Sequence, residues 1–359
     1  MRYIGNKTKL LPFLQATIRR LGIEPGTAHD AFAGTASVGR ALKADGWCVS
    51  SSDLMTYSYV MQRAYVVAST VDPLDRLADL SADVRHSLDG RENRIDAIAD
   101  YLSRGLAPVD GFITRHFAPA GGRMYFTDEN ARRIDAARTT LHTWRTQSLI
   151  AEDTFYVLLA AVIEGADRVA NTAGVYAAYI KRWQPNALRP FAVLPMEPVR
   201  SRLRCVAHRA DAVQVARELG PIDLLYVDPP YNTRQYSGYY HIPEVIARGW
   251  FEAPVAVRGK TGLIGDGQQR SAWCSRRHAP AALRALLAAT GARHVLVSYN
   301  TEGVIPDVEF RAILRDASID GRVRRFTRAY KRYRADSDRE GRRYKADRVR
   351  ELLYYARLR

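Results

Sequence analysis

The chain has 359 residues, enough for one large domain or two, and its 47% hydrophobic and 26% charged residues exclude a largely disordered protein. The formal net charge of +16 favours a polyanionic partner, most often a nucleic acid. Cys48, Cys205 and Cys274 are too few and too scattered for a disulfide framework or a zinc cluster, and we expect no metal site. No apolar run has the length of a signal peptide or a membrane span, so a cytoplasmic protein is expected.

The first fifty residues predict two strands joined by a helix. Residues 28–32 form a short apolar strand, residues 38–44 are helix-like, and residues 47–52 give a second strand that ends at Asp53. Such βαβ units build doubly wound sheets, so we expect an α/β fold with a parallel sheet.

The pattern changes to long helical periodicity between residues 56 and 170, which indicates a mainly helical insertion. Strand-like runs then return at residues 203–207, 222–227 and 294–299, and helix-like segments include residues 94–102, 128–149, 211–219 and 280–289. We therefore predict one domain made of residues 1–55 and 200–359, interrupted by a helical lobe of residues 56–199.

The C-terminal segment carries most of the excess charge. Residues 322–359 hold 15 Lys or Arg and 5 Asp or Glu, which gives +10 of the total +16. Two strand-like pieces, residues 323–330 and 352–356, flank a polar stretch with turn-forming residues, so we expect a hairpin with a basic tip that includes Arg342 and Arg343. The tip is either a nucleic-acid contact or a solvated surface without a ligand.

The most informative motif is Asp228-Pro229-Pro230-Tyr231, which follows the apolar strand at residues 222–227. The two prolines stop the strand and hold Asp228 and Tyr231 at the carboxyl edge of the sheet, where open α/β folds bind ligands. There the Asp228 carboxylate and the Pro229 carbonyl can accept both hydrogens of a planar amino group while Tyr231 stacks on its ring. The alternative is an ordinary strand-to-loop turn in which Asp228 is a cap.

This motif resembles the D-P-P-Y signature of Dam-like, amino-directed DNA adenine methyltransferases that use S-adenosylmethionine. Residues 2–11 look like the N-terminal cofactor motif of that family, and residues 30–39 are similar to its Asp-x-Phe-x-Gly-x-Gly turn. The resemblance implies a Rossmann-like methyltransferase sheet with a C-terminal β-hairpin and an inserted target-recognition lobe. Ala36 departs from the pattern, because it replaces the second glycine and adopts a positive φ only at a cost.

The resemblance also implies a cofactor pocket for S-adenosylmethionine. Lys7 is carried over as the partner of the methionine carboxylate, Asp53 as the ligand of the ribose hydroxyls and Asp211 as a contact of the cofactor's adenine. The whole set is Tyr3, Lys7, Asp30, Phe32, Gly34, Thr35, Asp53, Asp211 and Ala212. Taken alone, each acidic residue fits a helix cap as well, and the segment around Lys7 fits a turn before an amphipathic helix.

Basic and aromatic residues in two further segments are candidates for binding DNA. The set is Tyr176, Lys181 and Arg182 in residues 171–186, Arg234, Tyr236 and Tyr240 after the D-P-P-Y motif, and Arg342 and Arg343 in the basic hairpin. Residues 171–186 fit a packed helix-to-loop junction equally well. His241 is either structural or a DNA contact.

The leading hypothesis is a site-specific DNA methyltransferase that flips adenine out of a short duplex sequence and methylates its N6 amino group. We expect a monomer that is the modification half of a restriction–modification system, with any restriction endonuclease encoded separately, although the sequence itself does not determine the oligomeric state. A ribosomal RNA base methyltransferase is the nearest alternative, and a catalytically inactive DNA-binding homologue is a second. Methylation of a cytosine amino group also stays open, because its chemistry is alike.

Overall fold

The computed structural model describes residues 1–71, 74–78, 82–91, 93–265, 270–301, 303–331 and 348–358. The chain divides into two compact units, each assembled from several segments. The sheet unit consists of Asn6–Leu54, Ser201–Gln235 and Gln268–Arg359, and the helical unit of Met1–Gly5, Met55–Arg200 and Tyr236–Gly267. The sequence-based boundaries assigned Met1–Gly5 and Tyr236–Gly267 to the catalytic domain, whereas these segments group with the helices.

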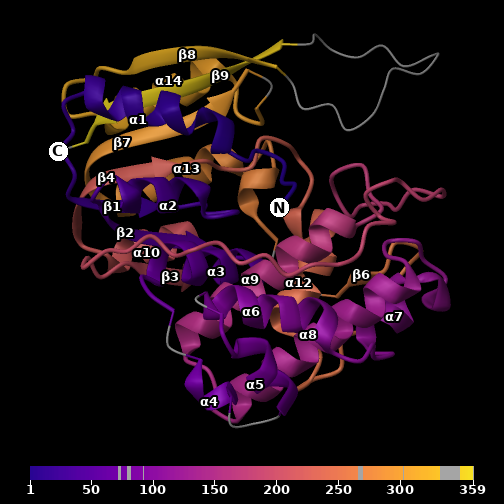
Figure 1. Cartoon of the computed structure of the whole chain (residues 1–359). Helices are drawn as coiled ribbons and strands as arrows, with labels where there is room; N and C mark the ends of the chain where they lie inside the picture. Colours follow the sequence, from indigo (N-terminus) through magenta and orange to yellow (C-terminus); the bar gives the residue numbers. More distant parts are fainter. Residues whose placement is uncertain are drawn as a thin grey trace. The chain divides into compact units, whose positions relative to one another are not determined.

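A seven-stranded sheet with the order β3-β2-β1-β4-β7-β9-β8 forms the centre of the sheet unit (Figure 1). Its strands are β1 (Thr27–Asp30), β2 (Cys48–Asp53), β3 (Val206–Arg209), β4 (Pro221–Val227), β7 (Gly291–Asn300), β8 (Arg324–Lys331) and β9 (Arg348–Arg357). The first five strands in this order are parallel, and β9 runs antiparallel to both β7 and β8. The predicted Rossmann-like sheet with a C-terminal hairpin is therefore confirmed.

Helices cover both faces of this sheet. They are α1 (Leu11–Arg20), α2 (Ser37–Ala44), α10 (Ala212–Glu218), α13 (Ala279–Ala289) and α14 (Asp307–Ala317), with short 3-10 turns at Thr8–Leu10 and Ala272–Cys274. Apolar residues of α10, α13 and α14 pack with alternate strand residues such as Val227, Val297 and Tyr354 in one core. Helix α1 lies over the opposite face, since the Arg20 guanidinium stacks on Phe326 of β8.

The strand order reverses between β1 and β4, and open α/β sheets bind ligands at the carboxyl ends of the strands beside such a reversal. Asp30 is the last residue of β1 and pairs in register with Tyr226 of β4. Asp228 follows the end of β4 directly. The fold therefore brings two carboxylates to the edge of the sheet where a ligand site is expected.

The helical unit contains the whole of the predicted insertion, residues 56–199. Its elements are α3 (Thr56–Gln62), α4 (Asp75–Ala78), α5 (Ala82–Leu88), α6 (Arg94–Asp100), α7 (Phe112–Phe117), α8 (Asp128–Thr146), α9 (Glu152–Val169), α11 (Tyr236–Tyr239) and α12 (His241–Arg248), π-helical turns at Arg63–Val67 and Tyr101–Gly105, a 3-10 turn at Pro119–Gly121, and the two-stranded sheet of β5 (Val257–Arg258) and β6 (Leu263–Ile264). Among the described residues, no helix is long and apolar enough to cross a membrane.

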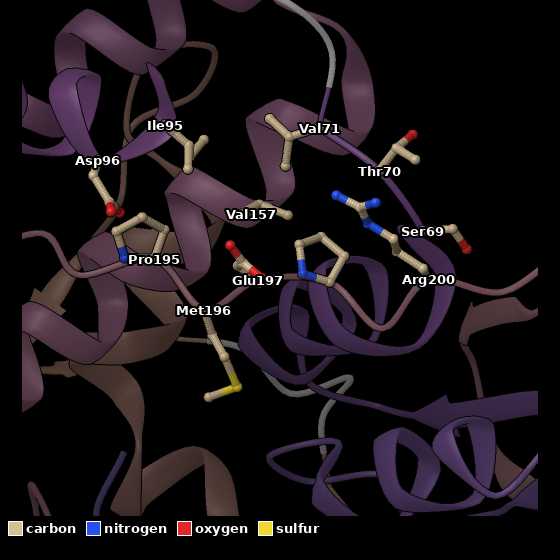
Figure 2. Close-up of a pocket in the computed structure, with 11 residues that line it drawn as sticks. Ser69, Thr70, Val71, Ile95, Asp96, Val157, Pro195, Met196, Glu197 and Arg200 are labelled. Carbon is tan, nitrogen blue, oxygen red and sulfur yellow. The ribbon is translucent and has the colours of Figure 1, made fainter. Parts of the chain in front are cut away.

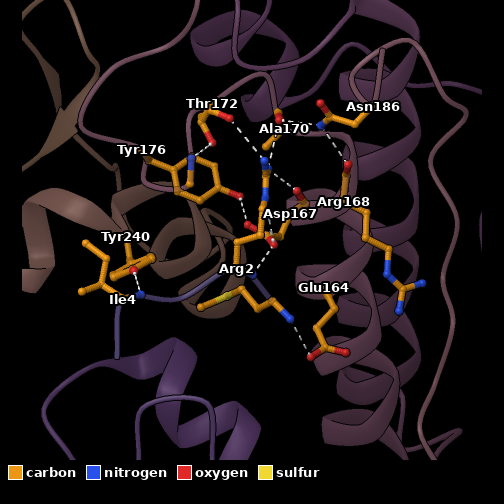
Figure 3. A network of polar contacts seen from close by, with 12 residues as sticks. Arg2, Ile4, Glu164, Asp167, Arg168, Ala170, Thr172, Tyr176, Asn186 and Tyr240 are labelled. Carbon is orange, nitrogen blue, oxygen red and sulfur yellow. Dashed lines mark hydrogen bonds and ion pairs between the residues drawn. The ribbon is translucent and has the colours of Figure 1, made fainter. Parts of the chain in front are cut away.

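The N-terminal residues form hydrogen bonds with the C-terminal end of α9 in this unit and with the residues that follow it (Figure 3). The Arg2 guanidinium donates to the carbonyl oxygens of Asp167, Ala170 and Thr172 at 2.5, 3.0 and 3.2 Å. The Asp167 carboxylate in turn accepts from the Arg2 backbone N–H at 2.6 Å and from the Tyr176 hydroxyl at 3.2 Å. Arg2 thus satisfies carbonyl groups that the end of a helix leaves without partners.

Candidate active site

The turn between β1 and α2 contains two residues with positive φ. Gly34 has φ of 53° and Ala36 has φ of 58°, so both lie in the left-handed region. The Gly34 N–H donates to the Asp53 carboxylate at 3.0 Å, which ties the turn to the end of β2. Ala36 is fully buried at the start of α2. The alanine thus preserves the turn, at the steric cost that a Cβ adds in this region.

Asp30 is a buried carboxylate with no hydrogen bond of ordinary geometry, although the backbone N–H groups of Phe32 and Gly39 are close enough to oppose the rise of its pKa. Its side chain is 1% exposed, and neither oxygen has a partner among the described residues. Burial, reinforced by the nearby charge of Asp228, raises the pKa of Asp30 to about 7. A buried carboxylate without a partner is unfavourable unless a cation or a donor joins it. Asp30 is therefore placed to receive a positively charged ligand group.

Asp228 is held through one of its two oxygens. The Tyr231 hydroxyl donates to Oδ1 at 2.5 Å, and the Lys7 ammonium lies 3.1 Å from the same atom. No described residue is bonded to Oδ2, and the side chain is 14% exposed. Burial raises the pKa of Asp228 to about 6, although Lys7 opposes this shift. Above that pH, Oδ2 is an ionised acceptor that is free for a substrate amine.

Lys7 uses all three of its N–H donors within the sheet unit. A side-chain turn, in which Asn6 accepts from the Thr8 backbone N–H at 2.8 Å, places Lys7 just before the first 3-10 turn. Its ammonium contacts the Tyr231 hydroxyl, Glu351 Oε1 at 2.7 Å and Asp228 Oδ1 at 3.1 Å. An ammonium has three donors, so the predicted contact with a methionine carboxylate requires one of these partners to be released.

The remaining predicted cofactor residues of the sheet unit lie at strand ends or in the β1–α2 turn. Phe32 packs edge-on against Trp273 with ring centroids 4.9 Å apart, and the neighbouring Thr35 is 9% exposed. Exposed Asp211 caps α10 by accepting from the Val213 N–H at 2.9 Å, and the next residue, Ala212, is buried. Tyr3 is the exception, because it belongs to the helical unit.

Two of the aromatic residues predicted to contact DNA are core residues of the helical unit. Tyr176 is 1% exposed and bonded to Asp167, and Tyr240 is fully buried, with its hydroxyl accepting from the Ile4 N–H at 2.7 Å. Tyr3 stacks on the Tyr240 ring with centroids 4.7 Å apart. Neither buried ring offers a surface to DNA, so this part of the prediction is corrected: both residues stabilise the helical unit.

The other predicted DNA contacts are accessible where the structure describes them. Lys181, Arg182 and Arg234 are exposed, and Tyr236 is half-buried. Arg342 and Arg343 lie outside the described residues, so their role in binding DNA stays a prediction.

The open question about His241 is answered by its burial. The ring is fully buried, and its nitrogens lie 3.4 Å from the Gly238 carbonyl oxygen and 3.0 Å from that of Thr261. Burial lowers the pKa of His241 to about 4, so the ring is neutral at physiological pH. His241 is a structural residue of the helical unit.

Sequence reasoning missed Glu351 and Ser298. Glu351 is 6% exposed on β9, and its Oε1 accepts from the Ser298 hydroxyl at 2.8 Å as well as from Lys7. A glutamate that directly precedes the apolar run at residues 352–356 is a signal that could have been noticed, because charged residues rarely enter a buried strand without a role.

The helical unit also contains a cavity of about 350 Å³ (Figure 2). Its lining includes Ser69, Thr70, Val71, Ile95, Asp96, Val157, Pro195, Met196, Glu197, Pro198 and Arg200. None of the predicted site residues belongs to this set.

The fold and the D-P-P-Y edge define a methyltransferase of the amino-directed class, and comparison with known proteins identifies the family. The model of the D12 class N6 adenine-specific DNA methyltransferase family matches residues 3–261. The chain belongs to this family.

Several curated relatives are similar over almost the whole chain. Type II methyltransferase M.NlaIII of Neisseria lactamica is 34% identical, over 99% of this chain and 98% of the relative. M.FokI of Planomicrobium okeanokoites is 31% identical over 99% of this chain and 52% of the relative, so the chain spans about half of that protein. M.CviAII of Paramecium bursaria Chlorella virus 1 is 29% identical over 93% of this chain.

The predicted function is thereby confirmed: the chain is an adenine-specific DNA methyltransferase. The alternatives of a ribosomal RNA base methyltransferase and of a cytosine amino methyltransferase are set aside, because the family acts on the N6 amino group of adenine in DNA.

Proposed function

We propose that this protein transfers a methyl group from S-adenosylmethionine to N6 of one adenine in a short duplex sequence, as the modification enzyme of a type II restriction–modification system. The observation that carries the proposal is the presence of two carboxylates at one edge of the sheet. Asp228 has a free Oδ2, and the Asp30 carboxylate has no partner among the described residues. The context is supported by the relatives, which include Type II methyltransferase M.NlaIII and Modification methylase LlaI.

The residues at the β1 edge fit S-adenosylmethionine. The cofactor, when bound, supplies a methyl group on a positively charged sulfur and also carries an ammonium group. Asp30 would bind a cationic group there, and Asp53 and Asp211 at the ends of neighbouring strands would bind polar groups of the nucleoside. The turn through Gly34 and Ala36 would let the ligand approach the backbone closely.

The D-P-P-Y residues would orient and activate the target amine. The adenine amino nitrogen is a poor nucleophile, because its lone pair is delocalised into the ring. Hydrogen bonds from the amine to Asp228 Oδ2 and to the Pro229 carbonyl would favour a more tetrahedral nitrogen with a localised lone pair. Proximity supplies the larger part of the acceleration, since the methyl donor is already activated.

The target adenine has to leave the duplex to reach Asp228, because the amine is otherwise paired inside the stack. Unstacking costs a few kcal/mol, which contacts with phosphates would offset. Exposed Lys181, Arg182 and Arg234 are the described candidates for such contacts.

The decisive test is sequencing with modified-base detection on DNA from a methylation-free host that expresses the protein. We expect N6-methyladenine at one position of a single short motif. The matched control is Asp228→Ala, which should leave the host DNA unmodified while the purified variant still binds S-adenosylmethionine in calorimetry. Unmodified DNA from the wild-type strain, together with no cofactor binding, would refute the proposal and favour an inactive DNA-binding homologue.

A further inference from the structure

The strand register brings a third carboxylate, that of Glu351, to the edge of the sheet that carries Asp30 and Asp228, called the catalytic edge below. Val227 pairs with Val297 in parallel β4 and β7, which sets Asp228 beside Ser298. Ser298 pairs with Leu353 of antiparallel β9. Side chains alternate along a strand, so Asp228, Ser298 and Glu351 point to the same face, the one that α1 covers.

Glu351 is bound there to the same ammonium as Asp228. Its Oε1 lies 2.7 Å from Lys7 Nζ, 2.8 Å from the Ser298 hydroxyl and 3.1 Å from the Tyr231 hydroxyl. The Lys7 and Glu351 side chains are only 5% and 8% exposed, so their ion pair is shielded from solvent and its geometry is constrained.

This arrangement shares Lys7 between two carboxylates. An ammonium on a flexible stem that faced Asp228 alone would be free to move toward the midpoint of that carboxylate and to occupy both oxygens. Glu351 holds Lys7 to one side, where the ammonium contacts Oδ1 and leaves Oδ2 without a partner among the described residues.

We propose that Glu351 is a positioning residue of the methyl-transfer site, which holds Lys7 on Asp228 Oδ1 and so keeps Asp228 Oδ2 available to the target amine. The inference rests on the proposed function of Asp228 as the acceptor of that amine. It assigns Glu351 no contact with DNA or with the cofactor.

The test compares Glu351→Ala, Glu351→Gln and the control Glu309→Gln, whose site is exposed on α14. Glu351→Ala should lower the single-turnover rate of methyl transfer on the order of 100-fold, as misplacement of a reacting group by about 1 Å does. The Kd values for DNA and for S-adenosylmethionine should change less than about threefold, since neither ligand touches Glu351. Glu351→Gln retains an acceptor for Lys7 and should recover most of the rate, and Glu309→Gln should match the wild type.

The dependence of the methyl-transfer rate on pH distinguishes a positioning role of Glu351 from a merely structural one. The groups that act on Asp228 are Lys7, Glu351, Tyr231, Tyr226 and Asp30, and the Glu351 charge raises the pKa of Asp228. Glu351→Gln removes that charge, so the acid limb of the rate profile should move to lower pH by about one unit. A wild-type rate and a wild-type acid limb in both Glu351 variants would overturn the proposal.

A double-mutant cycle with Lys7→Met tests whether Glu351 acts through Lys7. Lys7→Met leaves two buried carboxylates without their cation, so its urea midpoint should fall, and adding Glu351→Gln should partly restore the midpoint. Additive changes would overturn the proposal. This measurement needs no turnover, so it distinguishes failure of the inference from failure of the proposed function, in which the wild type itself would transfer no methyl group.

Discussion

The unpartnered carboxylate of Asp30 should destabilise the ligand-free protein at neutral and alkaline pH. Its pKa rises from 3.8 to about 7 on folding. The folded state therefore keeps a proton that the unfolded chain releases, and the group lowers the free energy of unfolding as pH rises from 4 to 7. Three units at about 1.4 kcal/mol each cost the folded state about 4 kcal/mol above pH 7.

Asp30→Asn removes that charge and keeps the shape of the side chain. The buried amide still lacks partners, at a cost of about 1–3 kcal/mol, so the net gain in the free energy of unfolding should be about 1–3 kcal/mol at pH 8. Near pH 3, below the unfolded-state pKa of 3.8, the wild-type carboxyl is mostly protonated in both states, and the advantage should disappear. Urea unfolding of both proteins across this pH range measures the difference.

The same substitution should abolish stabilisation by the cofactor. A ligand at 100 times its Kd adds about 2.7 kcal/mol to the free energy of unfolding, and this increment should be present in the wild type and lost in Asp30→Asn. An Asn variant that is less stable than the wild type at pH 8, or that S-adenosylmethionine stabilises as strongly, would refute the assignment of Asp30 to a cationic ligand group.

Three further predictions concern the turn, the acceptor and the DNA surface. Ala36→Gly should raise the free energy of unfolding by up to about 1 kcal/mol in urea titrations, because glycine relieves the strain at φ of 58°. The single-turnover rate of the wild type should fall as pH drops through about 6, where Asp228 becomes protonated, and a flat profile down to pH 5 would contradict its role. Lys181→Ala with Arg182→Ala should reduce the slope of log K against log salt by about 1–2, whereas exposed Arg217→Ala should leave it unchanged.

Local signals in the sequence were enough to predict the sheet. Short stretches of sequence predict these elements without reference to the rest of the chain. Examples are the strand at residues 222–227, the two prolines after it and the βαβ unit before Asp53. The structure places β4 at Pro221–Val227 and β2 at Cys48–Asp53 accordingly. The strand at residues 203–207 was placed too early, since β3 is Val206–Arg209, and the last strand was predicted at residues 352–356 whereas β9 is Arg348–Arg357.

Properties that depend on distant segments could not be predicted in this way. Tyr176 and Tyr240 lie in polar, aromatic stretches that are typical of accessible loops, yet both rings are buried. They pack against rings that are distant in the sequence, Tyr125 and Tyr3 respectively. Glu351 lies within β9, and the partner strands and register of β9 decide which side chains it meets. Neither is encoded in the neighbouring residues.

The carboxylates at the catalytic edge outnumber the cations that the described residues supply there. Lys7 supplies one positive charge to Asp228 and Glu351, so these three groups together are already negative when both acids are ionised. Asp30 adds a further carboxylate that has no cationic partner among the described residues, and burial, reinforced by the charge of Asp228, raises its pKa. S-adenosylmethionine, with a sulfonium, an ammonium and one carboxylate, has a net charge of +1. Its binding would compensate the excess negative charge and favour the ionised form of Asp228, which the target amine requires.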